Sequence, residues 1–160
     1  MSVTDNVTLP VLDRLSRWGL LSLRRQHTET DRLVRELDIK VASIKQQFSE
    51  LSGGNQQKAT LARALASGPR LCVLVDPTAG VDVASKEAIL TKVRALRDQG
   101  TGLLLVSDDE DDLRVCDRIV VMFQGHVIKE IASGWEAHDL VMAMEGWVGE
   151  SHHVGDDRGV

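Results

Sequence analysis

The sequence predicts an α/β fold in which a helical first part precedes a pair of parallel strands and a β-hairpin. Between residues 71 and 106, two short apolar runs are separated by one helical stretch, which is the pattern of a βαβ unit with a right-handed crossover. The runs at 119–123 and 126–131 flank Gln124-Gly125 and therefore indicate an antiparallel hairpin. Residues 1–50, by contrast, read as helical and show no strand pattern.

The first fifty residues are expected to hold two helices and an irregular connector. Pro10 stands where a helix can begin, because proline is tolerated at the first helical position. Apolar residues then recur at three-residue spacing until Gly19, namely Leu12, Leu15 and Trp18. A second helix is predicted from about Thr30, and its apolar side carries Leu33, Val34 and Leu37. Positions 38–50 follow neither period and read as a connector.

A third helix is predicted after Gly54 and ends at Ser67-Gly68-Pro69. The run at 71–75 then reads as a buried parallel strand, a further helix stops at Gly100, and 103–106 reads as a second buried strand. The helix after Gly54 has an apolar face formed by Leu61, Ala62, Leu65 and Ala66. The helix that stops at Gly100 has an apolar face formed by Ile89, Val93 and Leu96. After the hairpin, a short amphipathic segment is expected at about 136–144.

These elements suggest three parts of the chain. Residues 1–50 would form a helical subdomain, and residues 51–145 would form the rest of the folded core. Residues 146–160 are polar and contain glycine, so a flexible tail is expected there. His152-His153 stand near Asp156-Asp157 in this tail, where solvated side chains are a better interpretation than a metal site.

Composition excludes some classes of function. The formal net charge is −5 and no long block of lysine and arginine occurs, which argues against non-specific nucleic-acid binding. Cys72 and Cys116 lack CxxC spacing and read as reduced thiols. No signal peptide is visible in residues 1–7, and no apolar run approaches the ~20 residues that a membrane helix needs. Any link to a membrane is therefore expected to go through another protein.

Residues 51–58 read Leu-Ser-Gly-Gly-Asn-Gln-Gln-Lys. Two glycines allow a backbone to approach a ligand closely, and a helix that follows at once presents free N–H groups to an anion. This string resembles the signature motif of ATP-binding cassette (ABC) ATPases, in the form typical of sugar importers. Residues 6–10 resemble the element that opens the helical subdomain of the same ATPases. The resemblance covers about residues 2–145 and is to the C-terminal part of the second cassette.

The resemblance implies a partial P-loop NTPase (RecA-like) fold, with the helical signature subdomain and the C-terminal part of the parallel-sheet core. In this family ATP lies between two cassettes, and the signature of one closes over phosphates held by the P-loop of the other. Ser52, Gly53, Gly54 and Asn55 are therefore the expected nucleotide-binding residues. A tight helix cap is the alternative for a Gly-Gly pair alone, but the full string argues against it.

The phosphate-binding P-loop itself, G-x-x-x-x-G-K-[ST], does not occur in the sequence. Residues 54–60 come nearest, but Gln57 rather than glycine precedes Lys58. The lead-in at 48–50 is also not a buried strand. The chain is thus expected to start downstream of the family's P-loop and to bind or hydrolyse ATP poorly alone.

Residues 71–78 stand where the family has its Walker B strand. By resemblance, Val75 occupies the magnesium-binding aspartate position, which removes an oxygen ligand that a hard cation prefers. Asp76 occupies the position of the catalytic glutamate, and its side chain is one methylene shorter. A misplacement of about an ångström can cost ~10²-fold in rate. A structural role for Asp76, capping the turn before Pro77, is the alternative.

Two further aspartates fall on family positions. Asp82 stands where the family's D-loop aspartate bridges two cassettes, although aspartate is also a common turn residue. Asp108 stands at the switch position, where an ionised carboxylate would repel a phosphate. The acidic run 108–112 is expected to start a helix and otherwise to form a solvated face.

The leading expectation is an ATP-binding-cassette component of a carbohydrate import system. ATP and Mg²⁺ would be bound only together with another cassette that carries a P-loop, and permease subunits would hold the complex at the cytoplasmic face of the membrane. The alternatives are a non-catalytic interaction or regulatory fragment, and a decayed, truncated ATPase. Without the remaining core strands, the runs at 71–75 and 103–106 would expose apolar surface, so marginal stability in isolation is expected.

Overall fold

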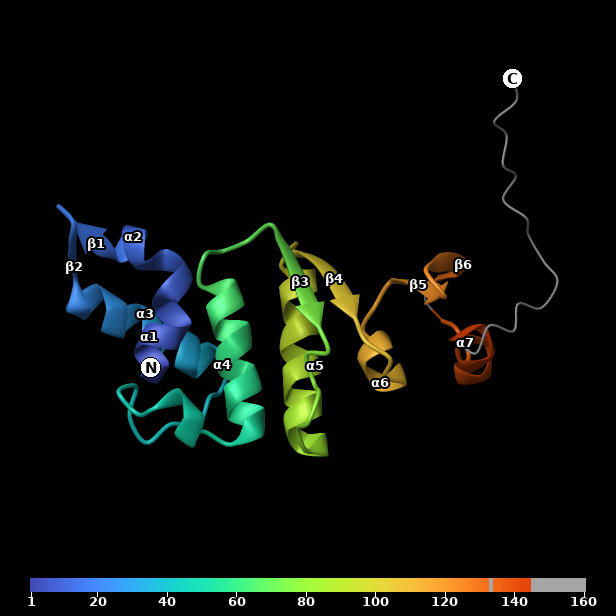
Figure 1. The fold of residues 1–160 in the computed structure, drawn as a ribbon, viewed down its shortest axis with the longest axis horizontal. Coiled ribbons are helices and arrows are strands. Elements are labelled where there is room, and N and C mark those ends of the chain that lie inside the picture. Colours follow the sequence, from blue (N-terminus) through green and yellow to red (C-terminus); the bar gives the residue numbers. More distant parts are fainter. Residues whose placement is uncertain (133, 145–160) are drawn as a thin grey trace, which may run out of the picture. The chain divides into compact units, whose positions relative to one another are not determined.

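The computed structural model describes residues 1–132 and 134–144. They group into two compact units, Met1–Val115 and a second unit that begins at Cys116, and Figure 1 shows their elements in chain order. The expected tail at 146–160, with His152-His153, lies outside the described residues. Among the described residues, no helix is long and apolar enough to cross a membrane.

The chain begins with three short helical segments and a small hairpin. Helix α1 (Val3–Thr8) runs into the 3₁₀ turn η1 (Leu9–Val11) and helix α2 (Leu12–Leu15). Strands β1 (Ser16–Arg17) and β2 (Leu20–Leu21) then pair antiparallel. The expectation that the first fifty residues hold no strand is therefore wrong, as is a helical place for Trp18.

Trp18 and Gly19 explain this error. Both have positive φ, 56° and 77°, and a type I′ hairpin turn requires positive φ at its two central residues. Trp18 is 90% exposed at this turn, so its three-residue spacing from Leu15 does not report a buried helix face.

Helix α3 (Leu23–Glu36) begins well before the predicted start at Thr30. Its first turns bury polar side chains, which hides the apolar period on which the prediction depended. Gln26 is buried and donates from Nε2 to Thr8 Oγ1 at 3.0 Å, while the buried Thr30 hydroxyl donates to the Gln26 carbonyl at 2.9 Å. The connector at 38–50 is irregular as predicted, apart from the 3₁₀ turn η2 (Phe48–Glu50).

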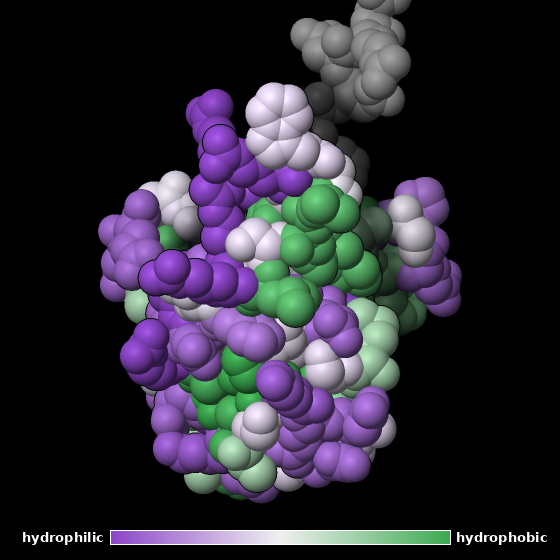
Figure 2. Space-filling model, turned by 90° about the vertical axis from the view of Figure 1, so that its left-hand side faces the viewer, coloured by the Kyte–Doolittle hydropathy of each residue, from purple (hydrophilic) through white to green (hydrophobic). Residues whose placement is uncertain are grey.

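Helix α4 (Gly53–Leu65) confirms the helix predicted after the glycine pair. It packs against α1, which also packs against α3, so these three helices share one core. That core contains the fully or almost fully buried side chains Val3, Val7, Leu33, Ala59 and Ala62. Figure 2 views the first unit from the side on which α1, α3 and the β1–β2 hairpin lie in Figure 1, and it shows a largely polar surface with apolar patches.

The βαβ unit is confirmed. Strand β3 (Leu71–Val75), helix α5 (Val83–Asp98) and strand β4 (Gly102–Val106) follow in order, and β3 pairs parallel with β4 from Leu71↔Gly102 to Val75↔Val106. The strands are not buried on both faces, however. One face carries exposed apolar side chains, namely Leu71, Val73, Val75, Leu104 and Val106, which are 50–65% exposed. The apolar exposure expected for these strands is therefore confirmed.

The remaining elements also follow the prediction. Helix α6 (Glu110–Leu113) starts in the acidic run. In the second unit, β5 (Arg118–Phe123) and β6 (His126–Ala132) form the expected hairpin, and α7 (Ala137–Met144) follows. Gln124 and Gly125 both have positive φ, 48° and 82°. This unit has its own small core, formed by Ile119, Val121, Leu140 and Ala143.

Candidate functional site

The candidate site is built around the first turn of α4. Ser52 is the N-cap, with an extended backbone, and its carbonyl accepts the Gln56 N–H at 2.9 Å. The N–H groups of Gly53, Gly54 and Asn55 precede this first helical bond, and so have no partner within the helix. Ser52 and Gly53 are exposed to solvent. This turn therefore offers free donors and the positive end of the helix dipole to an anion.

The side chain of Asn55 ties this turn to the preceding connector. Its Nδ2 donates to Ser52 Oγ at 2.8 Å, and its Oδ1 accepts the backbone N–H of Lys40 at 2.8 Å. The three residues also line one side of an open hollow of about 490 Å³ beside the turn. The Ser52 hydroxyl is thus held by a side chain of its own helix.

Gly53 lies against the loop that leads into α5, and Gly54 lies against the first turn of α5. An ideal Cβ on Gly54 would lie 2.3 Å from Ser85 Oγ and 2.7 Å from Ser85 Cβ, so only glycine fits there without a shift. A Cβ on Gly53 would lie 3.4 Å from the Gly80 carbonyl oxygen, which is an ordinary contact. The second glycine of the motif therefore has a packing role within this chain.

Asp82, the expected D-loop residue, is the N-cap of α5. Its Oδ1 accepts the Ser85 N–H at 3.0 Å and its Oδ2 accepts the Ser85 hydroxyl at 2.7 Å. These hydrogen bonds, that of the hydroxyl first, hold the pKa of the exposed Asp82 carboxyl below its usual value. Since Ser85 also lies against Gly54, the structure brings Asp82 close to residues 52–55, the first turn of α4 with its N-cap, which we call the signature turn.

Asp76 and Asp108 each follow the carboxyl end of a strand of the parallel pair, and both are exposed. The Asp76 N–H donates to the Val106 carbonyl at 2.8 Å, which extends the pairing by one residue. The Asp76 carbonyl then accepts the Ala79 N–H at 3.1 Å and closes a turn, with Asp76 at φ 44°. The backbone of Asp76, rather than its carboxylate, therefore closes the turn, and Pro77 lies within that turn.

Asp112 is a residue of this region that sequence reasoning missed. The acidic run was expected to be solvated apart from its helix, but Asp112 is only 1% exposed. Its carboxylate accepts the Thr78 hydroxyl at 2.7 Å and the Ser107 hydroxyl at 3.0 Å. It therefore joins the loop after β3 to the loop after β4. The order of residues gives no signal for it, because Thr78 and Ser107 meet it only in the fold.

Two lysines of this unit are engaged within the fold. Lys58, the last residue of the motif, is 8% exposed and donates from Nζ to the Asp38 carbonyl at 3.2 Å. It therefore supports the end of α3. Lys86 Nζ contacts Asp109 at 2.6 Å and Asp111 at 3.1 Å, and the bond to Asp109 is the main cause that raises the pKa of Lys86.

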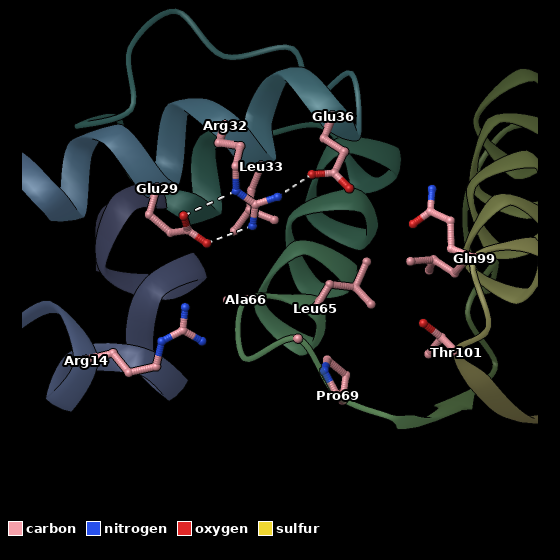
Figure 3. A pocket seen from close by; sticks show the side chains of 12 residues that line it. Arg14, Glu29, Arg32, Leu33, Glu36, Leu65, Ala66, Pro69, Gln99 and Thr101 are labelled. Carbon is pink, nitrogen blue, oxygen red and sulfur yellow. Dashed lines mark hydrogen bonds and ion pairs between the residues drawn. The ribbon is translucent and has the colours of Figure 1, made fainter.

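Another hollow, of about 410 Å³, lies at the opposite end of α4 and is shown in Figure 3. Arg32 lines this hollow and pairs with two other lining residues, Glu29 at 2.7 Å and Glu36 at 2.6 Å. The hydrogen bond from Arg32 lowers the pKa of Glu29. None of the site residues predicted from the sequence lines this hollow.

The residues of this site fit a phosphate group better than they fit a metal ion. The donors of the first turn of α4 fit a phosphate group at its exposed end, Ser52 and Gly53, whereas Gly54 is buried. At the end of β3, Val75 places an apolar side chain where the resemblance implies a magnesium ligand. Among the described residues, no group of three or more His, Cys, Asp or Glu side chains is arranged to hold a metal ion.

Comparison with known proteins shows which proteins this chain resembles. Residues 1–79 match the model of the ABC transporter family. The chain is 39% identical over 145 residues to ribose import ATP-binding protein RbsA 1 of Rhizobium etli, covering 89% of this chain and 28% of that protein. It is 35% identical over 161 residues to RbsA 2 of Streptomyces coelicolor, covering 99% of this chain and 31% of that protein. The chain thus spans less than a third of these relatives.

Solved structures agree. A dimeric ATP-binding cassette in a post-hydrolysis state, bound to ADP and Pi, superposes with a TM-score of 0.73 at 25% identity, covering 82% of this chain and 56% of that one. A nucleotide-free cassette from an ABC transporter has a TM-score of 0.76 at 22% identity, covering 94% and 64%, and supports the fold alone. The chain thus matches the ABC transporter family over residues 1–79, and it has the fold of a partial ATP-binding cassette.

Proposed function

We propose that this chain is a component of a carbohydrate import system and that it presents its signature turn to ATP held by another cassette. Two comparisons support this. Relatives at 35–39% identity are named ribose import ATP-binding proteins, and one similar solved cassette is a dimer bound to ADP and Pi. The chain shares about a third or less of the length of those relatives, so both the carbohydrate and the partner are part of the proposal.

The observation that carries the proposal is the exposed first turn of α4. Ser52 and Gly53 face solvent, and the N–H groups of the turn have no partner within the helix. A phosphate placed there would accept hydrogen bonds from Ser52 Oγ and from the backbone of residues 53–55. Hydrogen bonds to a charged group contribute about 1.5–3 kcal/mol each, so this turn is worth a measurable share of nucleotide affinity.

Little ATPase activity is proposed for the chain alone. The sequence contains no P-loop to hold the β- and γ-phosphates. Mg²⁺, which neutralises phosphate charge when it is bound, would come with the nucleotide on the other cassette, because Val75 offers no oxygen ligand. Asp76 is the one carboxylate at the position of the family's water-orienting glutamate, and its shorter side chain would serve that role poorly.

The proposed partners are therefore a P-loop-bearing cassette and the permease subunits of a sugar importer, at the inner face of the membrane. A non-catalytic interaction fragment or a decayed ATPase remains the alternative. The exposed apolar face of β3 and β4 is the observation that favours an interaction role.

Binding of a fluorescent ATP analogue with Mg²⁺ tests the proposal. The chain would be titrated alone, then together with a P-loop-bearing cassette of a sugar importer. We expect weak binding by the chain alone and tighter binding in the mixture than with the P-loop cassette alone. Replacing Ser52→Ala should remove roughly tenfold of that gain, the equivalent of one hydrogen bond to a charged group.

Ser67→Ala is the matched control, because Ser67 is an exposed serine at the other end of α4. It should bind as the unchanged chain does. Tight binding by the chain alone would contradict the claim that it needs another cassette to bind ATP. Equal binding by the Ser52→Ala and unchanged chains in the mixture would favour the interaction or decayed alternatives.

A further inference from the structure

The hydrogen bonds of Asn55 have a consequence for how Ser52 would meet a phosphate. A backbone N–H can only donate, so the Lys40 N–H at 2.8 Å must face the Oδ1 of Asn55. The amide of Asn55 is therefore fixed in one orientation, and its Nδ2 must face Ser52 Oγ, which lies 2.8 Å away.

This arrangement sets the direction of the Ser52 hydroxyl. A serine hydroxyl has one hydrogen to donate and two lone pairs to accept. Because Asn55 Nδ2 donates to Ser52 Oγ, it occupies a lone pair and leaves the hydroxyl hydrogen available. Ser52 is exposed, and no acceptor for its hydroxyl hydrogen is found among the described residues. An accepted hydrogen bond also polarises a hydroxyl and makes it a better donor.

We propose that Asn55 is a positioning residue that acts through Ser52, holding the Ser52 hydroxyl as a donor toward the terminal phosphate of a nucleotide. The inference rests on the proposed function, since it assumes that the turn meets a nucleotide. It divides the roles within the motif: the Asn55 backbone N–H faces the anion, while its side chain faces Ser52 and Lys40. The connector residue Lys40 thereby becomes part of the support of the site.

The replacement Asn55→Asp tests this role, because it keeps the shape of the side chain and the acceptor for the Lys40 N–H. It removes the donor to Ser52 Oγ, so the Ser52 hydroxyl would turn and donate to the new carboxylate instead. A negative charge in the first turn of α4 favours the helix dipole. The variant should therefore unfold at or above the temperature of the unchanged chain, so lost binding could not be attributed to lost structure.

The measurement is binding of the fluorescent ATP analogue with Mg²⁺ to a mixture of the chain and a P-loop-bearing cassette. We expect Asn55→Asp to weaken binding by roughly tenfold or more, as for Ser52→Ala, since one charge-assisted hydrogen bond is lost in each. Asn55→Ala should weaken binding less, because the Ser52 hydroxyl then rotates freely without being turned away.

A double variant separates positioning from simple charge repulsion. If Asn55 acts through Ser52, Asn55→Asp should cost much less affinity once Ser52→Ala is already present. An equal cost in both backgrounds would mean that the new carboxylate only repels the phosphates, and would overturn the inference. So would unchanged binding by Asn55→Asp where Ser52→Ala is impaired. If Ser52→Ala itself binds normally, the proposed function fails rather than this inference alone.

Discussion

Gly53 and Gly54 are neighbours in the signature turn, yet their surroundings differ. A Cβ on Gly54 would lie 2.3 Å from Ser85 Oγ, whereas a Cβ on Gly53 would make only an ordinary contact. We predict that Gly54→Ala lowers the free energy of unfolding by about 1–3 kcal/mol, as for overpacking of a tight site. Gly53→Ala should be neutral or stabilise the helix by up to ~1 kcal/mol. Urea denaturation of both variants measures the difference.

The contact partner offers a control for this prediction. Adding Ser85→Gly to Gly54→Ala removes both close atoms, so the double variant should lose less stability than the two single changes added together. Strict additivity would show that the loss in Gly54→Ala does not come from this contact.

Asp112 is the second residue whose environment sets a prediction. Removing its buried carboxylate leaves the Thr78 hydroxyl, itself on a buried residue, without its acceptor. Asp112→Ala should cost about 1–3 kcal/mol, the usual cost of a buried polar group left unsatisfied. Asp111→Ala, at a 65% exposed side chain in the same helix, should cost under about 1 kcal/mol. Similar losses in the two variants, measured by thermal or urea unfolding, would contradict the account.

Among the elements, helix α5 depends on its N-cap in a way that pH reveals. The pKa of Asp82 is lowered in the folded chain, so its contribution to stability is complete above the unfolded value of about 3.9. It is lost as pH falls through the lower folded value. As pH falls from about 4 through the lower folded value, the unfolding free energy should therefore fall less steeply in Asp82→Ala than in the unchanged chain. Parallel curves would show that this cap is not coupled to folding.

Some helices and strands could be predicted from the sequence and others could not. The βαβ unit and the hairpin β5–β6 were predicted, because their apolar runs are continuous and are bounded by glycine. Helix α1 was missed because polar side chains, Thr4 and Thr8 among them, are buried on it. The start of α3 was placed too late because Gln26 and Thr30 are buried there, where Gln26 donates to the Thr8 hydroxyl and Thr30 donates to the Gln26 carbonyl. Periodicity of apolar residues cannot report a buried face that is polar.

At the candidate site, the sequence predicted which residues form the signature turn but not their support. The string at 51–58 identifies Ser52 and the glycines by resemblance. The contact of Gly54 with Ser85, and the bond of Asn55 to the Lys40 N–H, join positions far apart in the chain. Such pairs follow from tertiary packing alone, and no local spacing predicts them. The nucleotide-binding role of these residues stays a prediction.

For the molecule as a whole, the exposed face of β3 and β4 governs behaviour in solution. Five apolar side chains there are 50–65% exposed, although parallel sheets are ordinarily covered on both faces. We predict self-association and binding of a hydrophobic dye, both reduced by the double change Val73→Thr and Leu104→Gln. Sedimentation and dye fluorescence measure the two effects.

Val83→Thr is the control for this face, because Val83 is 84% exposed at the start of α5 and lies outside the strand pair. It should leave dye binding and association unchanged. If the double variant Val73→Thr and Leu104→Gln binds dye as strongly as the unchanged chain, the exposed face of β3 and β4 is not the surface that binds the dye.

The central claim is that this chain closes over a nucleotide held by another protein, and the rate of nucleotide release tests it most directly. A P-loop-bearing cassette loaded with the fluorescent ATP analogue and Mg²⁺ would be chased with unlabelled ATP, with and without this chain. The account predicts that the chain slows release by roughly tenfold and that Ser52→Ala restores the faster rate. Release at the same rate with and without the chain would contradict it.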